Sequence, residues 1–150
     1  MKLAQALLLR GDVQKKIAAL RERIGRNVLV QEGDSPHEDP NQLLHEATAS
    51  IEEFQRLAVS INTANLSHRL PDGRSLTEAM AARDALIQRH ALLQSAIAAA
   101  QKEPNRYSAR EIKWATAIDV AKIQNQSDDV ARKVRELNSA IQETNWKIEL

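Results

Sequence analysis

The chain has 150 residues, the size of a single domain, and contains no cysteine, which excludes disulfides and thiolate metal sites. Its 21 lysines and arginines balance 20 aspartates and glutamates, so no long-range field attracts a polyanion, and nucleic acid is disfavoured as a partner without being excluded. Hydrophobic residues make up 43% of the chain but aromatic residues only 3%, so a core must consist of Leu, Ile, Val and Ala.

The first predicted element is a helix from about Lys2 to about Val28. Its apolar residues follow alternating steps of three and four, which place them in one narrow stripe. That stripe contains Leu3, Ala6, Arg10, Val13, Ile17, Leu20 and Ile24. The start of the chain resembles a signal peptide, but Arg10 comes too early and no small-residue cleavage site follows. No apolar run reaches the ~20 residues of a membrane-spanning helix, so we expect a cytoplasmic protein and no membrane association.

An acidic loop at residues 31–40 precedes the second predicted helix. Its carboxylates and His37 could hold a divalent cation, but their order does not match the twelve-residue calcium loop, and we favour a solvated loop without metal. Asp39 as a cap and Pro40 at the first helical position start the helix, which fades near residues 62–65. Its predicted stripe contains Leu44, Ala47, Ile51, Phe54, Ala58 and Ile61.

The third predicted helix follows a turn at residues 70–73, where Pro71 fixes φ and the Asp-Gly pair tolerates positive φ. Ser75 and Glu78 form a capping box that opens this helix, which ends before Pro104. Its stripe contains Leu76, Ala79, Arg83, Leu86, His90, Leu93 and Ile97.

Residues 112–118 allow two interpretations. Their apolar residues alternate as in a half-buried strand, which residues 66–70 could pair with, whereas a capping box from Ser108 to Glu111 favours a helix that begins there. If the segment is extended, Asp119 caps the last helix, which reaches about Trp146. The stripe of that helix contains Val120, Ile123, Ser127, Val130, Val134, Leu137 and Ile141.

Together these elements predict a mainly α fold: four long, heptad-patterned antiparallel helices in a coiled-coil-like bundle, forming one helical domain over residues 1–150. A small strand or hairpin element at residues 66–76 and 112–118 is compatible with this fold. Narrow, alanine-rich seams bury little apolar area per residue, so a lone copy would be only modestly stable. We therefore expect the chain to self-associate as a homo-oligomer.

Several charged or polar residues interrupt the stripes or stand beside them. A buried cation is costly unless it is paired, so each needs an acidic or carbonyl partner. We expect a structural polar network that fixes the register of the helices, and we keep a polar ligand pocket near His90 as the less favoured alternative. The candidate residues of this network are Arg10, Arg83, Asp84, His90, Glu111 and Asp119.

Basic residues with two neighbouring aromatic residues are frequent in the two later connections. If the fold brings these connections to one end, they form a surface for an anion or for a protein or nucleic-acid partner. Solvated turn residues are the preferred explanation, because no nucleic-acid-binding motif accompanies them. The candidate residues of this surface are Arg74, Arg106, Tyr107, Arg110 and Lys113.

No arrangement of residues indicates catalysis. The chain has no nucleophile elbow and no glycine-rich phosphate loop, and the adjacent carboxylates Glu52 and Glu53 point about 100° apart on a helix. We expect no catalytic residue, no cofactor and no metal site. The sequence favours an interaction or scaffold protein over an enzyme.

Motifs spread over nearly the full length resemble a family of small, uncharacterised bacterial helical proteins, some of which carry the label septicolysin. The resemblance rests on segments 30–34 and 38–40, on Asn62 and Asn65, on segments 72–79 and 83–84, and on segments 106–108, 111–113, 119–120, 141–143 and 145–146. It implies a mainly helical protein with no assigned catalytic residues. The label would imply a secreted, membrane-perforating toxin, which we disfavour because the chain lacks a signal peptide and a strongly basic amphipathic helix.

Overall fold

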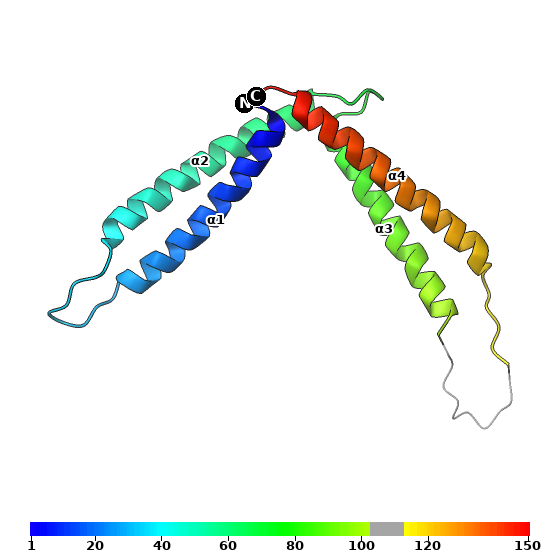
Figure 1. Cartoon of the computed structure of the whole chain (residues 1–150), viewed down its shortest axis with the longest axis horizontal. Coiled ribbons are helices and arrows are strands. Elements are labelled where there is room, and N and C mark those ends of the chain that lie inside the picture. The colour runs from blue at the N-terminus through cyan, green and yellow to red at the C-terminus, as the bar shows by residue number, and fades with distance from the viewer. Residues whose placement is uncertain (103–112) are drawn as a thin grey trace. The chain divides into compact units, whose positions relative to one another are not determined.

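The computed structural model describes residues 1–102 and 113–150. They form four α-helices, namely α1 (Leu3–Asn27), α2 (Pro40–Ser67), α3 (Leu76–Ala100) and α4 (Val120–Lys147) (Figure 1). Over the described ranges there is no strand, and the extended pairing is limited to isolated bridges, Lys2 with Glu149 and Arg69 with Ser75. The predicted all-α fold with four long helices is therefore confirmed.

The chain divides into two compact units. Unit 1 contains Met1–Leu76 and Gln142–Leu150, and unit 2 contains Thr77–Ile141. Each unit is built around a pair of helices that lie side by side, α1 with α2 and α3 with α4 (Figure 1). The assignment of all 150 residues to one domain stays a prediction.

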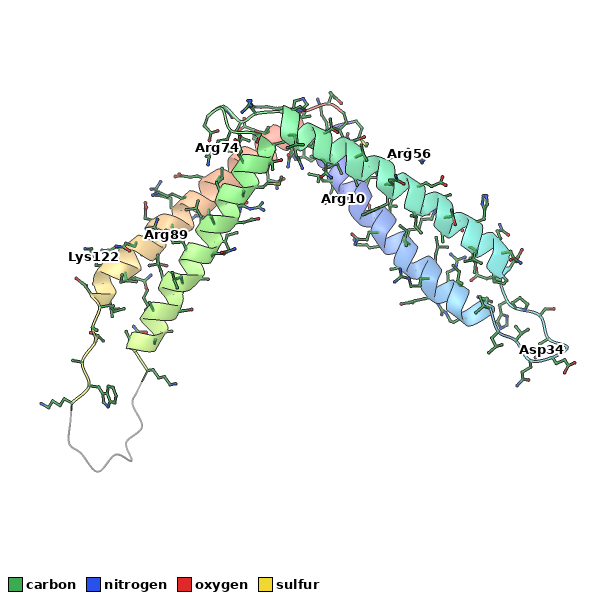
Figure 2. The ribbon with its side chains drawn as sticks, turned by 180° about the vertical axis from the view of Figure 1, so that it is seen from behind. Arg10, Asp34, Arg56, Arg74, Arg89 and Lys122 are labelled. Carbon is green, nitrogen blue, oxygen red and sulfur yellow. The ribbon has the colours of Figure 1, made fainter. Side chains whose placement is uncertain are left out.

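In unit 1, α1 carries the buried stripe that its spacing predicts. Leu3 and Leu20 are fully buried and Val13 is 4% exposed, while Ile17 and Ile24 are half-buried. Arg10, a member of the same stripe, is also half-buried on α1 (Figure 2). The three-four spacing therefore identified the packed face of this helix.

The packed face of α2 agrees with the predicted one only in part, since Ile61 is 1% exposed as expected. Leu44 and Ile51 are 49% and 52% exposed, whereas their preceding neighbours Leu43 and Ser50 are 4% and 2% exposed. The buried series runs in helical steps from Leu43 through Ser50 to Leu57, Ile61 and Ala64. The expectation for Leu44 and Ile51 was wrong because α2 has two adjacent stripes with the same period, and periodicity alone does not choose between them.

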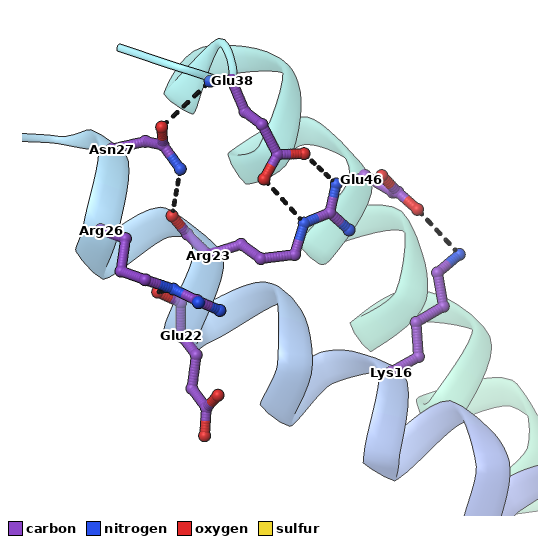
Figure 3. A network of polar contacts seen from close by, with 7 residues as sticks. All are labelled: Lys16, Glu22, Arg23, Arg26, Asn27, Glu38 and Glu46. Atoms are coloured by element: carbon purple, nitrogen blue, oxygen red, sulfur yellow. Dashed lines mark hydrogen bonds and ion pairs between the residues drawn. The ribbon is translucent and has the colours of Figure 1, made fainter.

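Polar contacts fasten the connection between α1 and α2 (Figure 3). Arg23 Nε donates to Glu38 Oε2 at 3.0 Å, and Arg23 Nη2 also bonds to Glu38. Asn27, which is 7% exposed, donates from Nδ2 to the Arg23 carbonyl at 2.8 Å and accepts the Glu38 backbone N–H at 3.0 Å. The hydrogen bond from Arg23 lowers the pKa of Glu38 below its ordinary value. The end of α1 thus holds the backbone that leads into α2.

Helix α2 begins as its cap predicts. The Asp39 carboxylate accepts the N–H of Asn41 at 2.9 Å, and Pro40 occupies the first helical position. Further along the pair, Lys16 Nζ lies 3.2 Å from Glu46 Oε1. At the other end of unit 1 the two termini of the chain meet, since Leu3 N donates to Ile148 O at 3.0 Å and Leu150 N donates to Met1 O at 2.9 Å.

In unit 2 the predicted stripes of α3 and α4 are both packed. Ala79, Ile97, Val130 and Leu137 are 7% exposed or less. Ser127 is fully buried and accepts a hydrogen bond from Gln94 Nε2 at 2.7 Å, which joins α4 to α3. A single polar pair between aliphatic layers fixes the register of the two helices, as isolated polar residues do in other helical seams.

The segment before α4 is neither of the two predicted alternatives. Residues 113–118 form no strand and no helix, and their side chains are exposed, Trp114 by 79%. Residue 112 and the expected cap residues Ser108 and Glu111 lie outside the described residues. The alternation of apolar residues wrongly suggested a strand. No partner strand lies within the described ranges, and Leu66, the first residue of the expected partner, belongs to α2. Helix α4 begins at Val120, after Asp119.

Candidate interaction surface

The structure describes five of the six residues of the predicted polar network. In unit 2, Arg83 donates from Nε and Nη2 to Asp84 Oδ1 at 3.0 and 2.8 Å. Asp119 caps α4 by accepting the N–H of Lys122 at 3.1 Å. His90 is half-buried on α3, Arg10 lies in unit 1, and Glu111 is outside the described residues. Among the described residues of unit 2, the network therefore shows one ion pair between neighbours and one helix cap.

Arg74, from the predicted anion surface, is bound to its own turn. Its Nε and Nη2 donate to Asp72 Oδ2 at 2.9 and 2.6 Å, and its backbone N–H donates to Asp72 Oδ1 at 3.0 Å. Gly73 takes a φ of +89°, a conformation that favours glycine. Arg69 Nη1 likewise donates to the Gly73 carbonyl at 2.8 Å. An anion would have to compete with Asp72 for the Arg74 guanidinium.

The turn at residues 70–74 should weaken in acid. The Arg74 side chain, and then its backbone N–H, lower the pKa of Asp72 below its ordinary value. A carboxylate with a depressed pKa in the folded state stabilises the fold above its unfolded pKa, and this contribution is lost as the pH falls through the folded pKa. We expect the protection factor of the Arg74 amide, its slowing relative to the intrinsic exchange rate at the same pH, to fall as Asp72 becomes protonated, as NMR would measure. Asp72→Asn cannot titrate, so the protection factor of this amide should stay constant over the same pH range, and the wild-type pH profile in that variant would contradict this role of Asp72.

Of the predicted anion surface, the structure describes Arg74 and Lys113. Lys113 is exposed and follows α3 in the chain, whereas Arg74 precedes it, so the 25 residues of that helix separate them in sequence. Arg106, Tyr107 and Arg110 lie outside the described residues. Arg74 belongs to unit 1 and Lys113 to unit 2, and the anion surface stays a prediction.

The acidic loop before α2 uses two of its carboxylates structurally. Glu38 binds Arg23 and Asp39 caps α2. In the part of the chain that the structure describes, no three His, Asp or Glu side chains come together as ligands of a metal ion. Nor does any described helix combine the length and the apolar character needed to cross a membrane.

The feature that the sequence interpretation missed is a second, exposed stripe on α2. Leu44, Ile51, Val59 and Leu66 are 49%, 52%, 60% and 66% exposed. They follow one another at steps of seven, eight and seven residues, close to two helical turns each, so they lie on one side of the helix. This side is about 145° around α2 from the buried stripe, at about 100° per residue.

Polar but uncharged residues fill the spaces between these aliphatic residues. Thr48, Gln55 and Asn62 are exposed at the intervening positions. The Thr48 hydroxyl donates to the Leu44 carbonyl at 2.9 Å, so this hydroxyl is already satisfied within the helix. We call these residues the uncharged face of α2: Leu44, Thr48, Ile51, Gln55, Val59, Asn62 and Leu66. The signal in the sequence was a surplus, because α2 has more large aliphatic residues than one stripe uses.

Comparisons with known proteins agree with the fold. A family model described as a family of unknown function, DUF6847, matches residues 10–150. A solved structure, the crystal structure of a functionally unknown conserved protein from Corynebacterium diphtheriae, is similar with a TM-score of 0.88 and 32% sequence identity, covering 100% of this chain and 98% of that one. No curated protein matches the chain. The chain belongs to the family of unknown function DUF6847.

Proposed function

We propose that the chain is a non-catalytic helical interaction or scaffold protein that self-associates through the uncharged face of α2. The observation that supports this function is the row of four large aliphatic side chains, each about half exposed or more, along one side of that helix. Contiguous exposed apolar surface marks interaction sites in proteins more often than scattered apolar residues do. In this proposal the protein acts in the cytoplasm, as its sequence predicts.

The energetics favour a reversible assembly. Covering the exposed halves of four aliphatic side chains contributes about 3–6 kcal/mol per copy, and both copies contribute in a dimer. Association costs on the order of 4–15 kcal/mol in lost translational and rotational freedom, which is a similar magnitude. We therefore expect a dimer that dissociates on dilution.

Light scattering over a hundredfold range of concentration tests the proposal. The mass should rise from that of one copy toward that of two as the concentration increases. The dimer should persist in high salt, because salt does not screen apolar contacts. Ile51→Glu should keep the protein monomeric, since a buried, unpaired carboxylate opposes association. Leu8→Glu is the matched control, because Leu8 is 65% exposed on α1 and lies outside the uncharged face. A wild-type mass of one copy throughout would overturn the proposal.

The label septicolysin, carried by relatives that the sequence resembles, suggests membrane lysis as the competing function. We favour the interaction role because a helix that lies in a membrane surface needs a strongly basic polar face, whereas the uncharged face of α2 is bordered by both Glu52 and Arg56. Vesicles of anionic lipid loaded with dye distinguish the two functions. They should retain the dye at protein concentrations that give the dimer, and rapid release would favour lysis.

A further inference from the structure

We infer that two copies pair antiparallel through the uncharged face of α2, with the two-fold axis at Gln55. This inference rests on the proposed self-association and specifies its geometry. In a two-fold interface, residue i of one copy meets residue j of the other, and j meets i. A helix face can form such an antiparallel contact when residues of similar character lie at equal distances on both sides of a central residue.

The uncharged face of α2 has this symmetry. Leu44 and Leu66 each lie eleven residues from Gln55, Thr48 and Asn62 lie seven residues away, and Ile51 and Val59 lie four residues away. Antiparallel pairing therefore places aliphatic residues against aliphatic residues and polar residues against polar ones. At the centre Gln55 meets its own counterpart, and two amides can each donate and accept a hydrogen bond.

Charged residues beside the face favour an antiparallel over a parallel arrangement of the two α2 helices. Glu52 and Arg56 are exposed on the same flank of α2, and neither side chain forms an ion pair or hydrogen bond with any residue in the described ranges. In an antiparallel pair the same flank of each helix meets, so each Glu52 lies within a turn of Arg56 of the other copy. The two Arg56 residues lie equally close along the axis, so two attractive contacts outweigh one repulsive contact. In a parallel pair this flank would meet the opposite one, where Ala47 and Ala58 offer no charge.

The size of the face limits the strength of the pairing. Leu44 to Leu66 spans about 33 Å at 1.5 Å per residue. One helix face can bury less area than the roughly 800 Å² that each partner buries in a standard stable interface. A dimer that exchanges with its monomer is therefore expected.

Single cysteines test the geometry, because the natural chain has none. Gln55→Cys should give a disulfide-linked dimer under mild oxidation, because the two cysteines face each other on the axis. Thr48→Cys alone should give none, since the two Thr48 positions would be about 21 Å apart, beyond the roughly 7 Å limit for bridged Cα atoms. A mixture of Thr48→Cys with Asn62→Cys should cross-link. Equal cross-linking of Thr48→Cys and Gln55→Cys alone would establish a parallel pair and overturn the inference.

Light scattering of the same samples separates the two levels of the proposal. Dimers that form without cross-linking at Gln55→Cys would overturn the antiparallel pairing but leave self-association intact, whereas monomers at every concentration would overturn both. A charge exchange adds an independent measurement. Glu52→Arg should raise the dissociation constant several-fold, and adding Arg56→Glu to the same chain should restore it. Circular dichroism on each variant checks that the helices are retained, and failure of the restoration in folded protein would contradict the predicted pairing of Glu52 with Arg56.

Discussion

Leu43→Ala is expected to lower the free energy of unfolding by about 2–5 kcal/mol, whereas Leu44→Ala should lower it by about 1 kcal/mol or less. The two leucines are neighbours on α2 with the same helix propensity, but Leu43 is 4% exposed and Leu44 is 49% exposed. Truncating the buried side chain leaves a cavity between α1 and α2. Truncating the exposed one removes surface that water already reaches.

Urea denaturation followed by circular dichroism measures this difference. It should be carried out at low protein concentration, because dimerisation through Leu44 would otherwise add to the apparent stability. The comparison tests which of the two stripes of α2 is packed. A larger loss for Leu44→Ala would show that Leu44 belongs to the packed face, and equal losses would show that packing does not distinguish the two leucines.

Asn27→Ala has the second large expected effect, a loss of about 1–3 kcal/mol in the free energy of unfolding. The Asn27 amide is buried and bonds at once to the Arg23 carbonyl and the Glu38 backbone N–H. Alanine leaves both groups without this partner at the connection between α1 and α2. Thermal or urea unfolding measures the loss, and hydrogen exchange should locate it at the end of α1 and the start of α2.

Asn125→Ala is the matched control for this substitution. Asn125 is exposed on α4, and alanine there should leave stability unchanged or raise it slightly, because alanine has the higher helix propensity. Similar effects of the two alanine substitutions would mean that the Asn27 contacts contribute nothing beyond helix propensity.

Much of the fold could be predicted from the sequence, because local signals determine helix ends. Asp39 and Pro40 mark the start of α2, and Gly73 marks the turn before α3, where the backbone requires positive φ. The packed face of α2 could not be predicted in the same way. Leu43 and Leu44 have equal apolar character, and only their contact with α1 decides which one is buried.

The candidate site was less accessible to sequence reasoning than the fold. Charged residues such as Arg74 and Arg83 are obvious site candidates in a sequence. In the structure their guanidinium groups bind the nearby carboxylates of Asp72 and Asp84. Exposed aliphatic residues are instead mistaken for core residues. Ile51 and Val59 are examples, because only the structure shows that they face water. A surplus of apolar residues on one helix is therefore a useful indication of an interaction surface.

Ser50 on α2 and Ser127 on α4 are both small, buried residues within otherwise aliphatic stripes. Their small size limits which side chains the helix contacts at these positions accommodate. Leucine at either position would push two helices apart along their length. Alanine fits both positions, but at Ser127 it also removes the acceptor of the Gln94 hydrogen bond. Variation should therefore be restricted by side-chain volume at Ser50, and by volume and polarity together at Ser127.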